Sequence, residues 1–157
     1  MLVEALRAAR NERAQRARGG IVPSGDVYPI MAVVYPLSFL AMIGEGFVRG
    51  GPTSASVLAG LVVFAAAKAL KWWAITALGP AWTFRVVVVP GSRRVTSGPY
   101  LYLRHPNYVA VAGELIGAAL MSGAWIAGTV STIVFVALIV KRISVETAAL
   151  DAILPPT

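Results

Sequence analysis

Polar and aromatic side chains crowd one short segment of a sequence that is otherwise strongly apolar. Within nine residues the chain places three tyrosines, an arginine and its only histidine: Tyr100, Tyr102, Tyr108, Arg104 and His105. An apolar helix is predicted to begin at Pro106, which suits a first turn and biases His105 away from helical backbone angles. Tyrosine and arginine also anchor proteins at membrane interfaces, but their density here favours a binding site over anchoring alone.

Three charged residues further along the chain are candidates to act with this cluster. Glu114 lies in an apolar stretch, nine residues beyond His105, where a charge costs at least about 2–3 kcal/mol on insertion scales. His105 and Glu114 are therefore the candidate general bases near the mouth of the helix. Arg142 and Glu146 are four residues apart, and spacing alone favours an exposed helical ion pair.

Composition excludes several kinds of chemistry. The chain has no cysteine and one histidine, which removes disulfides, thiolate metal sites, cysteine nucleophiles and a zinc site of the usual kind. No metal ion is expected. The sequence contains no P-loop and no nucleophile elbow. The glycines around Glu45 do not follow a strand and lack the spacing of a dinucleotide-binding turn.

The elements that must position these residues are membrane helices. Hydrophobic residues make up 57% of the chain and charged residues 13%, with a mean hydropathy of +0.73. We therefore predict an all-α integral membrane protein with about four transmembrane helices. Its apolar stretches cover residues 27–48, 54–78, 106–121 and 124–140. The last two are short and are predicted to form a tight hairpin around Ser122 and Gly123. Gly113 and Gly117 form a G-x-x-x-G pair that favours close helix packing.

The positive charges predict how the chain is oriented. Eleven of the fourteen lysines and arginines fall in segments 1–26, 79–105 and 141–157, which lie on one side if all four stretches cross. The positive-inside rule then places both termini in the cytoplasm, and the lack of cysteine fits a bacterial inner membrane. Glu45 and Lys68 lie near the ends of their predicted spans and are expected to snorkel to the interface.

Two segments outside the predicted spans have a character of their own. Residues 1–26 are predicted to form a basic cytoplasmic surface helix over 2–18 and a linker, and residues 27–157 a single membrane domain. The helix contains five arginines but no aromatic residue to stack on bases. We therefore expect it to lie on anionic lipid and expect no nucleic acid partner. Residues 83–89 favour a β-strand that pairs back with 93–96 in a short cytoplasmic hairpin.

The polar segment and its surroundings resemble one enzyme family. The motifs GPY at 98–100 and RHPNY at 104–108 are similar to the signature of the isoprenylcysteine carboxyl methyltransferase family. The later RISVE at 142–146 also resembles a family element, and the similarity extends over residues 54–151. The resemblance implies an integral membrane methyltransferase that binds S-adenosylmethionine without a Rossmann domain, in a pocket on the cytoplasmic face.

The resemblance also implies which residues bind the cofactor: Gly98, Tyr100, Leu103, Arg104, His105, Tyr108, Arg142 and Glu146. With it, Arg142 and Glu146 are better interpreted as ligand contacts than as a surface ion pair. Glu146 can pair with the ammonium group of the cofactor, and Arg104 or Arg142 with its carboxylate. The tyrosines offer aromatic faces to the sulfonium and the adenosine.

Two departures from the family pattern bear on the site. The second glutamate of the later motif is Thr147 here, which removes one polar contact. The given sequence also lacks the aromatic tail of the family, so we expect a more open site or one that uses the N-terminal arm. Arg142 and Glu146 are expected on a cytoplasmic C-terminal helix. Within the family, RHPNY followed by Glu114 is most similar to a bacterial branch associated with O-methylation of alkylpyrones.

These features predict S-adenosylmethionine-dependent O-methylation, at a carboxyl or hydroxyl group, of a lipid or hydrophobic small molecule in the membrane. A carboxylate acceptor needs no general base, whereas a phenol or enol gains from one. Two alternatives stay open. One is an NADPH-dependent membrane reductase of the sterol-reductase type, which carries a similar RHPNY segment, and the other is a non-catalytic membrane adaptor. The small-residue faces permit a homodimer without requiring one.

Overall fold

The computed structural model describes residues 2–153 and contains, within that range, five α-helices, two 3₁₀-helices and no β-strand. The α-helices are α1 (Leu2–Ala17), α2 (Tyr28–Val48), α3 (Ser54–Leu78), α4 (Pro106–Ser122) and α5 (Trp125–Ile153). The 3₁₀-helices lie in the connection between α3 and α4, and are η1 (Gly79–Ala81) and η2 (Gly98–Leu101). The prediction of an all-α protein is confirmed.

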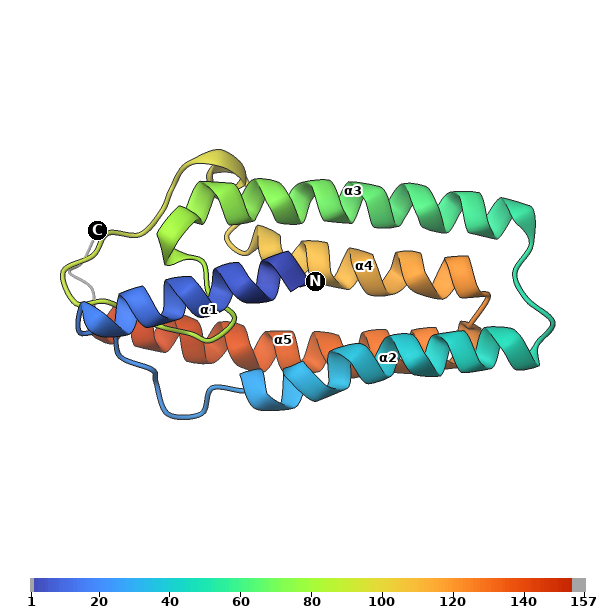
Figure 1. Cartoon of the computed structure of the whole chain (residues 1–157), viewed down its shortest axis with the longest axis horizontal. Helices are drawn as coiled ribbons and strands as arrows, with labels where there is room; N and C mark the ends of the chain where they lie inside the picture. The colour runs from blue at the N-terminus through green and yellow to red at the C-terminus, as the bar shows by residue number, and fades with distance from the viewer. Residues whose placement is uncertain (1, 154–157) are drawn as a thin grey trace.

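The helices α2 to α5 form an antiparallel bundle along the long axis of the molecule (Figure 1). The turns between α2 and α3 and between α4 and α5 lie at one end. The α3–α4 connection, the linker after α1 and the last turns of α5 lie at the other end, which we call the loop end. Helix α4 packs against α2, α3 and α5, and α1 lies beside the half of the bundle nearest the loop end.

Glycines let α3 and α4 approach closely. A Cβ atom at Gly60 would lie 2.6 Å from the carbonyl oxygen of Gly117, and one at Gly117 would lie 2.8 Å from the backbone nitrogen of Phe64. A Cβ atom at Gly113 would meet the Cβ atom of Ala67 at 2.9 Å. These distances leave no room for a side chain, as is typical where membrane helices pack backbone to backbone. The predicted close packing through Gly113 and Gly117 is confirmed.

Three helices are long and apolar enough to cross a membrane: Tyr28–Val48, Ser54–Ala81 (α3 continued by η1) and Trp125–Ile153. Their outward faces expose large apolar side chains such as Phe47 and Leu58, an arrangement that suits contact with lipid. The chain is therefore an integral membrane protein. Helix α4 has 17 residues and is only about 26 Å long, short of the roughly 30 Å hydrocarbon core. The count of four spans therefore stays a prediction.

The turn after α4 agrees with the sequence, whereas the helix that follows is longer than predicted. Gly123 adopts a left-handed conformation with φ of 67° and ends α4, so the tight hairpin at Ser122 and Gly123 is confirmed. The span predicted over 124–140 and the C-terminal helix are parts of one continuous helix, α5, of 29 residues. Neither glycine nor proline occurs between Lys141 and Glu146, so nothing interrupts the helix there.

The predicted β-hairpin in the α3–α4 connection is wrong. Residues 83–96 form no strand. Val88 instead makes an isolated antiparallel bridge with Ile21 in the linker after α1, with both N–H···O distances at 2.9 Å. Val86 and Val88 bury their side chains in a cluster with Ala149 of α5. The apolar residues of this run therefore pack on a helix rather than beside a second strand.

The N-terminal helix α1 packs on the bundle, whereas the sequence predicts a helix that lies on the lipid surface. Ala8 is buried against Trp82. The Asn11 side chain donates hydrogen bonds to the carbonyl oxygens of Gly79 (3.0 Å) and Trp82 (2.8 Å), which satisfies acceptors at the C-terminal end of α3. The arginines from Arg10 onward remain exposed and are still available to anionic lipid.

The two charged residues that were expected to snorkel have partners within the protein. The Glu45 carboxylate accepts hydrogen bonds from the backbone N–H groups of Ile126 (3.0 Å) and Ala127 and so caps the start of α5. Lys68 Nζ lies 2.8 Å from a carboxylate oxygen of Glu114. Contacts within the bundle, rather than a reach to the interface, therefore place both charges.

Candidate functional site

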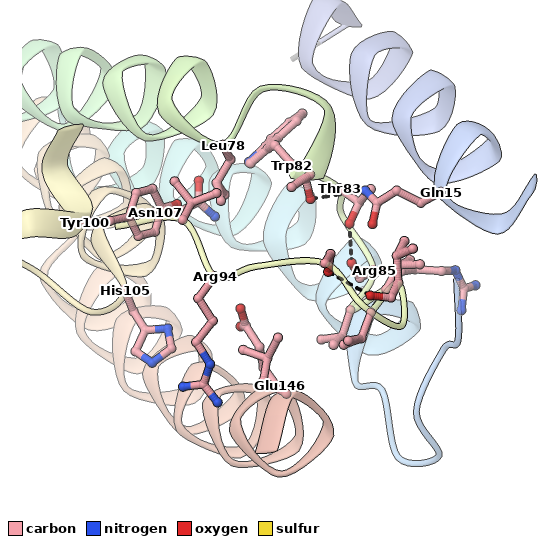
Figure 2. Close-up of a pocket in the computed structure, with 18 of the residues that line it drawn as sticks. Gln15, Leu78, Trp82, Thr83, Arg85, Arg94, Tyr100, His105, Asn107 and Glu146 are labelled. Atoms are coloured by element: carbon pink, nitrogen blue, oxygen red, sulfur yellow. Dashed lines mark hydrogen bonds between the residues drawn. The ribbon is translucent and has the colours of Figure 1, made fainter. Parts of the chain in front are cut away.

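A pocket of about 390 Å³ opens at the loop end of the bundle (Figure 2). Its wall is assembled from three parts of the chain: the end of α1, the α3–α4 connection with the start of α4, and the C-terminal turns of α5. We call it the loop-end pocket. Pockets for small organic ligands commonly have volumes of about 300–1,000 Å³, so its size suits such a ligand.

Tyr108 lies at the centre of one wall. Its hydroxyl donates a hydrogen bond to Glu146 Oε2 (2.5 Å) and accepts one from Arg142 Nε (2.8 Å). The His105 ring stacks on the Tyr108 ring with centroids 5.5 Å apart. Arg142 and Glu146 are thus joined through the hydroxyl of a residue on another helix instead of forming the exposed pair that their spacing favoured. This arrangement holds the Glu146 carboxylate in a fixed position on the pocket wall.

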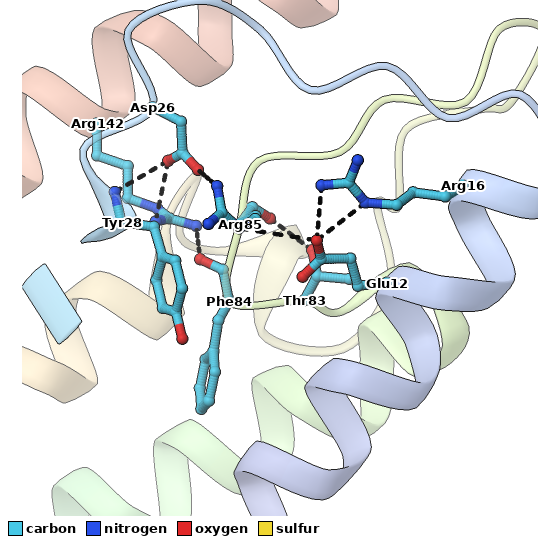
Figure 3. A network of polar contacts seen from close by, with 8 residues as sticks. All are labelled: Glu12, Arg16, Asp26, Tyr28, Thr83, Phe84, Arg85 and Arg142. Carbon is cyan, nitrogen blue, oxygen red and sulfur yellow. Dashed lines mark hydrogen bonds and ion pairs between the residues drawn. The ribbon is translucent and has the colours of Figure 1, made fainter.

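Arg142 is enclosed by the protein (Figure 3). Its side chain is 8% exposed and lies 3.6 Å from Asp26, and its guanidinium donates a hydrogen bond to the backbone oxygen of Phe84. Asp26 also lies 3.8 Å from Arg85, so the network ties the linker after α1 and the α3–α4 connection to α5. Because protein groups engage the guanidinium, the structure makes Arg142 a support for Tyr108 and the loop.

The loop-end pocket also carries other arginines. Arg104, a predicted site residue, lines it, and so does Arg94, which the sequence reasoning missed. Arg94 forms an ion pair with Asp151 near the end of α5. Figure 2 shows its guanidinium on the same side of the pocket as His105 and Glu146. The pocket therefore offers both a carboxylate and guanidinium groups to a ligand that carries both charges.

Tyr100 contributes a half-buried phenol to the pocket. It lies in η2 and lines the pocket wall. Burial, reinforced by the Glu146 carboxylate, raises the pKa of the Tyr100 phenol above its usual range. The group therefore stays a neutral hydroxyl, able to donate a hydrogen bond, throughout the physiological pH range.

Two buried polar atoms of pocket residues have no hydrogen-bond partner within residues 2–153. They are Trp82 Nε1, a donor, and Asn107 Oδ1, an acceptor. Leaving such an atom unpaired costs about 1–3 kcal/mol, and buried polar groups in native structures are nearly always bonded. A ligand in the pocket that carries both an acceptor and a donor could satisfy these atoms.

Six of the eight residues predicted to bind a cofactor line this pocket: Tyr100, Arg104, His105, Tyr108, Arg142 and Glu146. Gly98 does not line it. This glycine has a φ of 62°, and a Cβ atom there would lie 2.9 Å from the Cβ atom of Ala77, so glycine is required where the chain passes α3. Leu103 is also outside the lining and is 40% exposed. Tyr102 packs against Trp73, away from the pocket.

Glu114, the second predicted base, lies elsewhere. It is fully buried in a cluster of charged side chains, which we call the ion cluster and which comprises Glu4, Lys68, Lys71 and Glu114. Its carboxylate also accepts a hydrogen bond from the hydroxyl of Tyr35. The structure therefore does not bring Glu114 into the loop-end pocket with His105. Across the described residues, no three side chains of the metal-ligating types His, Cys, Asp and Glu lie together.

The sequence reasoning missed residues that reach the pocket from α1. Gln15 and Arg18 line it, as expected if the site uses the N-terminal arm. The Gln15 side chain donates a hydrogen bond to the carbonyl oxygen of Pro80 (3.0 Å). Asn11 and Gln15 lie four residues apart and so share one helix face, a signal that could have indicated docking. Thr147, in place of the family's second glutamate, also lines the pocket.

Comparisons with known proteins show the family to which the chain belongs. A profile of the isoprenylcysteine carboxyl methyltransferase family matches residues 58–152. The chain is 30% identical over 144 residues to the uncharacterized protein YpbQ of Bacillus subtilis, covering 92% of this chain and 86% of that protein. It is 25% identical over 147 residues to an uncharacterized protein of Haemophilus influenzae, covering 93% and 86% of the two chains. No solved structure gives a significant match. The chain therefore belongs to the isoprenylcysteine carboxyl methyltransferase family, a family of membrane methyltransferases.

Proposed function

We propose that the protein is an S-adenosylmethionine-dependent methyltransferase that O-methylates a hydrophobic molecule dissolved in the membrane. The observation that carries the proposal is the loop-end pocket, where residues 104–108 and Glu146 meet at the end of an apolar bundle. The pocket presents charges of both signs together with aromatic faces. Membership of the family supports the class of reaction.

The residues of the pocket fit the parts of this cofactor. Glu146, held by Tyr108, would pair with the ammonium group, and Arg94 or Arg104 would pair with the carboxylate. The rings of Tyr100 and Tyr108 would lie against the adenosine and the positively charged sulfonium. Arg142 contributes indirectly, because it holds the Tyr108 hydroxyl that in turn holds Glu146.

The two unpaired atoms give an independent test of fit. An adenine edge carries an amino donor beside ring-nitrogen acceptors, and Asn107 Oδ1 and Trp82 Nε1 supply the complementary acceptor and donor. NADPH also carries an adenine, so these atoms alone do not separate the two cofactors. The Glu146 carboxylate favours a ligand that brings a cationic group to it, which S-adenosylmethionine has and NADPH lacks.

The chain's own residues position the reactants and, where needed, accept a proton. When bound, the cofactor supplies a methyl group that passes in line to an acceptor oxygen while the electron pair of the broken bond stays on sulfur. Tyr108 and Glu146 would fix the position of the cofactor's methyl group before its transfer. Positioning supplies most of the catalysis in a methyl transfer of this kind. His105 takes the proton of a hydroxyl acceptor, whereas a carboxylate acceptor has none to give.

The acceptor and the orientation follow from the same proposal. The acceptor is a lipophilic hydroxyl or carboxyl compound, and long-chain alkylpyrones are candidates because the segment from RHPNY to Glu114 resembles the bacterial branch.

The loop end faces the cytoplasm of a bacterial inner membrane, because the basic helix α1 and the arginines of the α3–α4 connection lie there. In this proposal helix α4 is the fourth span, and the linker after α1 and the last turns of α5 lie on the cytoplasmic side.

Calorimetric titration of the detergent-solubilised protein with S-adenosylhomocysteine, the product of the cofactor, tests the proposal. We expect micromolar binding that Glu146→Ala abolishes. Glu12→Ala is the matched control, because it removes a carboxylate of α1 that does not line the pocket. Binding of NADPH without binding of S-adenosylhomocysteine would replace the proposal with the reductase alternative. Binding of neither would favour the non-catalytic adaptor.

A further inference from the structure

A second pocket, of about 780 Å³, opens between α2, α3 and α4. It lies toward the turn between α2 and α3, at the end of the bundle opposite the loop end. Its main lining residues are apolar: Phe39, Ile43, Phe47, Phe64, Ala118 and Met121. We call it the apolar pocket. The methyl transfer proposed at the loop end makes no use of it.

The ion cluster adjoins the apolar pocket. Lys68 Nζ lies 5.7 Å from the centroid of the Phe64 ring. Tyr35, whose hydroxyl donates to Glu114, packs edge-on against Phe39 with ring centroids 4.9 Å apart. Because Phe64 and Phe39 line the apolar pocket, the rings of these two residues separate the apolar pocket from the ion cluster, which lies one helical turn further along the bundle. Together the two features have a charged end at the ion cluster and an apolar end toward the α2–α3 turn.

The ion cluster is neutral only because α1 contributes a carboxylate. Glu4 lies 3.1 Å from Lys68 and 3.0 Å from Lys71, and its side chain is 4% exposed. Figure 1 shows that α1 begins midway along the bundle, away from the loop end. Without Glu4, two ammonium groups would share the single carboxylate of Glu114. An unbalanced charge away from water is strongly unfavourable, so a state in which α1 leaves requires another anion at the lysines.

We propose that the two features together bind an acidic single-chain amphiphile whose hydrocarbon chain occupies the apolar pocket and whose anionic head replaces the Glu4 carboxylate between Lys68 and Lys71. The head is a small anion, a carboxylate or a phosphate monoester, because the space that it takes over holds one carboxylate. The exchange keeps the ion cluster neutral. The chain of the ligand exchanges one apolar environment, the bilayer, for another, so the charged head determines specificity.

Helix α1 has the properties that a reversible exchange requires. Its remaining attachments are a small apolar contact through Ala8, an ion pair of Glu12 with Arg85 (3.7 Å), and side-chain hydrogen bonds from Asn11 and Gln15. Hydrogen bonds of this kind contribute as little as about 0.5 kcal/mol each, and a partly exposed ion pair contributes about 0–1 kcal/mol, so each of these attachments is weak. The exposed arginines from Arg10 onward would hold a released α1 on anionic lipid. The proposal does not depend on methyl transfer and is tested by binding.

Binding of oleate to the full-length protein in a neutral detergent is the first test. Oleyl alcohol is the matched probe without a charge, and acetate is the head without a chain. We expect oleate to displace a fluorescent fatty acid from the protein, and both controls to fail at the same concentration. Equal displacement by oleyl alcohol would mean simple partition onto apolar surface and would overturn the proposal. Oleyl phosphate is the second anionic probe, and the tighter of the two acids identifies the head group.

Two substitutions should change oleate affinity in opposite directions. Lys68→Gln removes one charged partner, and we expect binding about tenfold weaker, as for the loss of one charge-assisted hydrogen bond. Glu4→Gln removes the internal competitor, and we expect tighter binding, which a folding defect cannot produce. Lys141→Gln, at an exposed position outside the cluster, is the matched control and should leave the affinity unchanged. Unchanged or weaker binding by Glu4→Gln would contradict the exchange.

The movement of α1 can be measured directly because the chain has no cysteine. Spin labels on the double variant Ala14→Cys with Thr76→Cys, both at exposed positions, report the distance between α1 and α3. We expect a single narrow distribution without ligand and a broad, longer one with oleate, but no change with oleyl alcohol. Oleate binding with an unchanged distance distribution would overturn the exchange with Glu4.

Discussion

The loop-end pocket and the ion cluster are both polar sites in an apolar bundle, but only in the ion cluster is every charged group paired within the chain, although Glu114 Oε1 makes its ion contact without a hydrogen bond. In the ion cluster, each carboxylate lies within 3.1 Å of both lysines. In the loop-end pocket, Trp82 Nε1 and Asn107 Oδ1 have no partner among the described residues. Incomplete pairing leaves a place where a polar ligand enters directly. A completed set of charges admits a ligand only if one of its own members, such as Glu4, gives way.

The largest effect that would test this contrast is a change of charge in the ion cluster. Lys71→Met leaves two buried carboxylates facing Lys68 alone, and such an imbalance costs about 3–5 kcal/mol. We expect thermal unfolding in detergent at a clearly lower temperature. The double variant Lys71→Met with Glu4→Gln restores the balance and should recover most of the loss. Equal stability of the single and double variants would show that the charges of Glu4 and Lys71 do not affect each other.

In the loop-end pocket, substitution should impair chemistry rather than folding. We expect His105→Asn to slow single-turnover methyl transfer to a hydroxyl acceptor by about a hundredfold, the usual contribution of a general base. Affinity for S-adenosylhomocysteine and transfer to a carboxylate acceptor should stay unchanged. Glu114→Gln should mainly destabilise the fold. We expect a clearly lower melting temperature and only a small change in the rate of methyl transfer. If His105→Asn slows transfer to both acceptors equally, His105 is not the base.

A smaller effect is expected for the charge on the pocket wall. Glu146→Gln keeps an acceptor for Tyr108 but removes the carboxylate charge, so binding of S-adenosylhomocysteine should weaken about thirtyfold, equivalent to about 2 kcal/mol. Calorimetry measures the affinity, and thermal unfolding should show no change. Thr147→Glu, which restores the family's second glutamate, should strengthen binding. A loss of stability as large as that of Lys71→Met would remove the distinction between the two sites.

The smallest effect is expected where α1 attaches near the loop end. Asn11→Ala removes two partly buried hydrogen bonds to backbone oxygens. At about 0.5 kcal/mol each, the low end for such bonds, their loss raises the released fraction of α1 roughly fivefold. The rate of tryptic cleavage at the α1 arginines should rise by the same factor. Thr76→Ala, at an exposed position on α3, is the control. An unchanged cleavage rate in Asn11→Ala would mean that Glu4 alone holds the helix.

The features that the sequence predicted depend on neighbours along the chain. Apolar runs indicate the long helices, and Gly113 and Gly117 share one helix face because of their spacing. Four of the predicted pocket residues, Tyr100, Arg104, His105 and Tyr108, belong to one short segment and come together once α4 begins at Pro106. The residues missed are Gln15 and Arg18, which come from the N-terminal segment, and Arg94, whose place in the α3–α4 connection depends on its ion pair with Asp151 of α5.

The features that the sequence did not predict depend on partners far along the chain. Lys68 was assigned to the interface because its partner Glu4 lies 64 residues away, on a helix whose arginines favoured a lipid surface. The β-strand propensity of residues 83–89 results in a single β-bridge, at Val88. Its partner Ile21 belongs to the linker after α1 and not to residues 93–96, the predicted second strand. In both cases the local tendency was real, but the docking of the N-terminal segment decided the outcome.

The unbroken length of α5 has a consequence for the membrane in which the protein works. The helix has 29 residues and is about 43 Å long, whereas a hydrocarbon core is about 30 Å thick. Its lipid-facing turns and the turns that carry Arg142 and Glu146 therefore tilt as one rod. A change in bilayer thickness changes helix tilt, and we expect it to act on the hydrogen bond that joins Glu146 of α5 to Tyr108 of the shorter α4. Acyl-chain length in the surrounding lipid is then expected to affect how well the pocket is assembled.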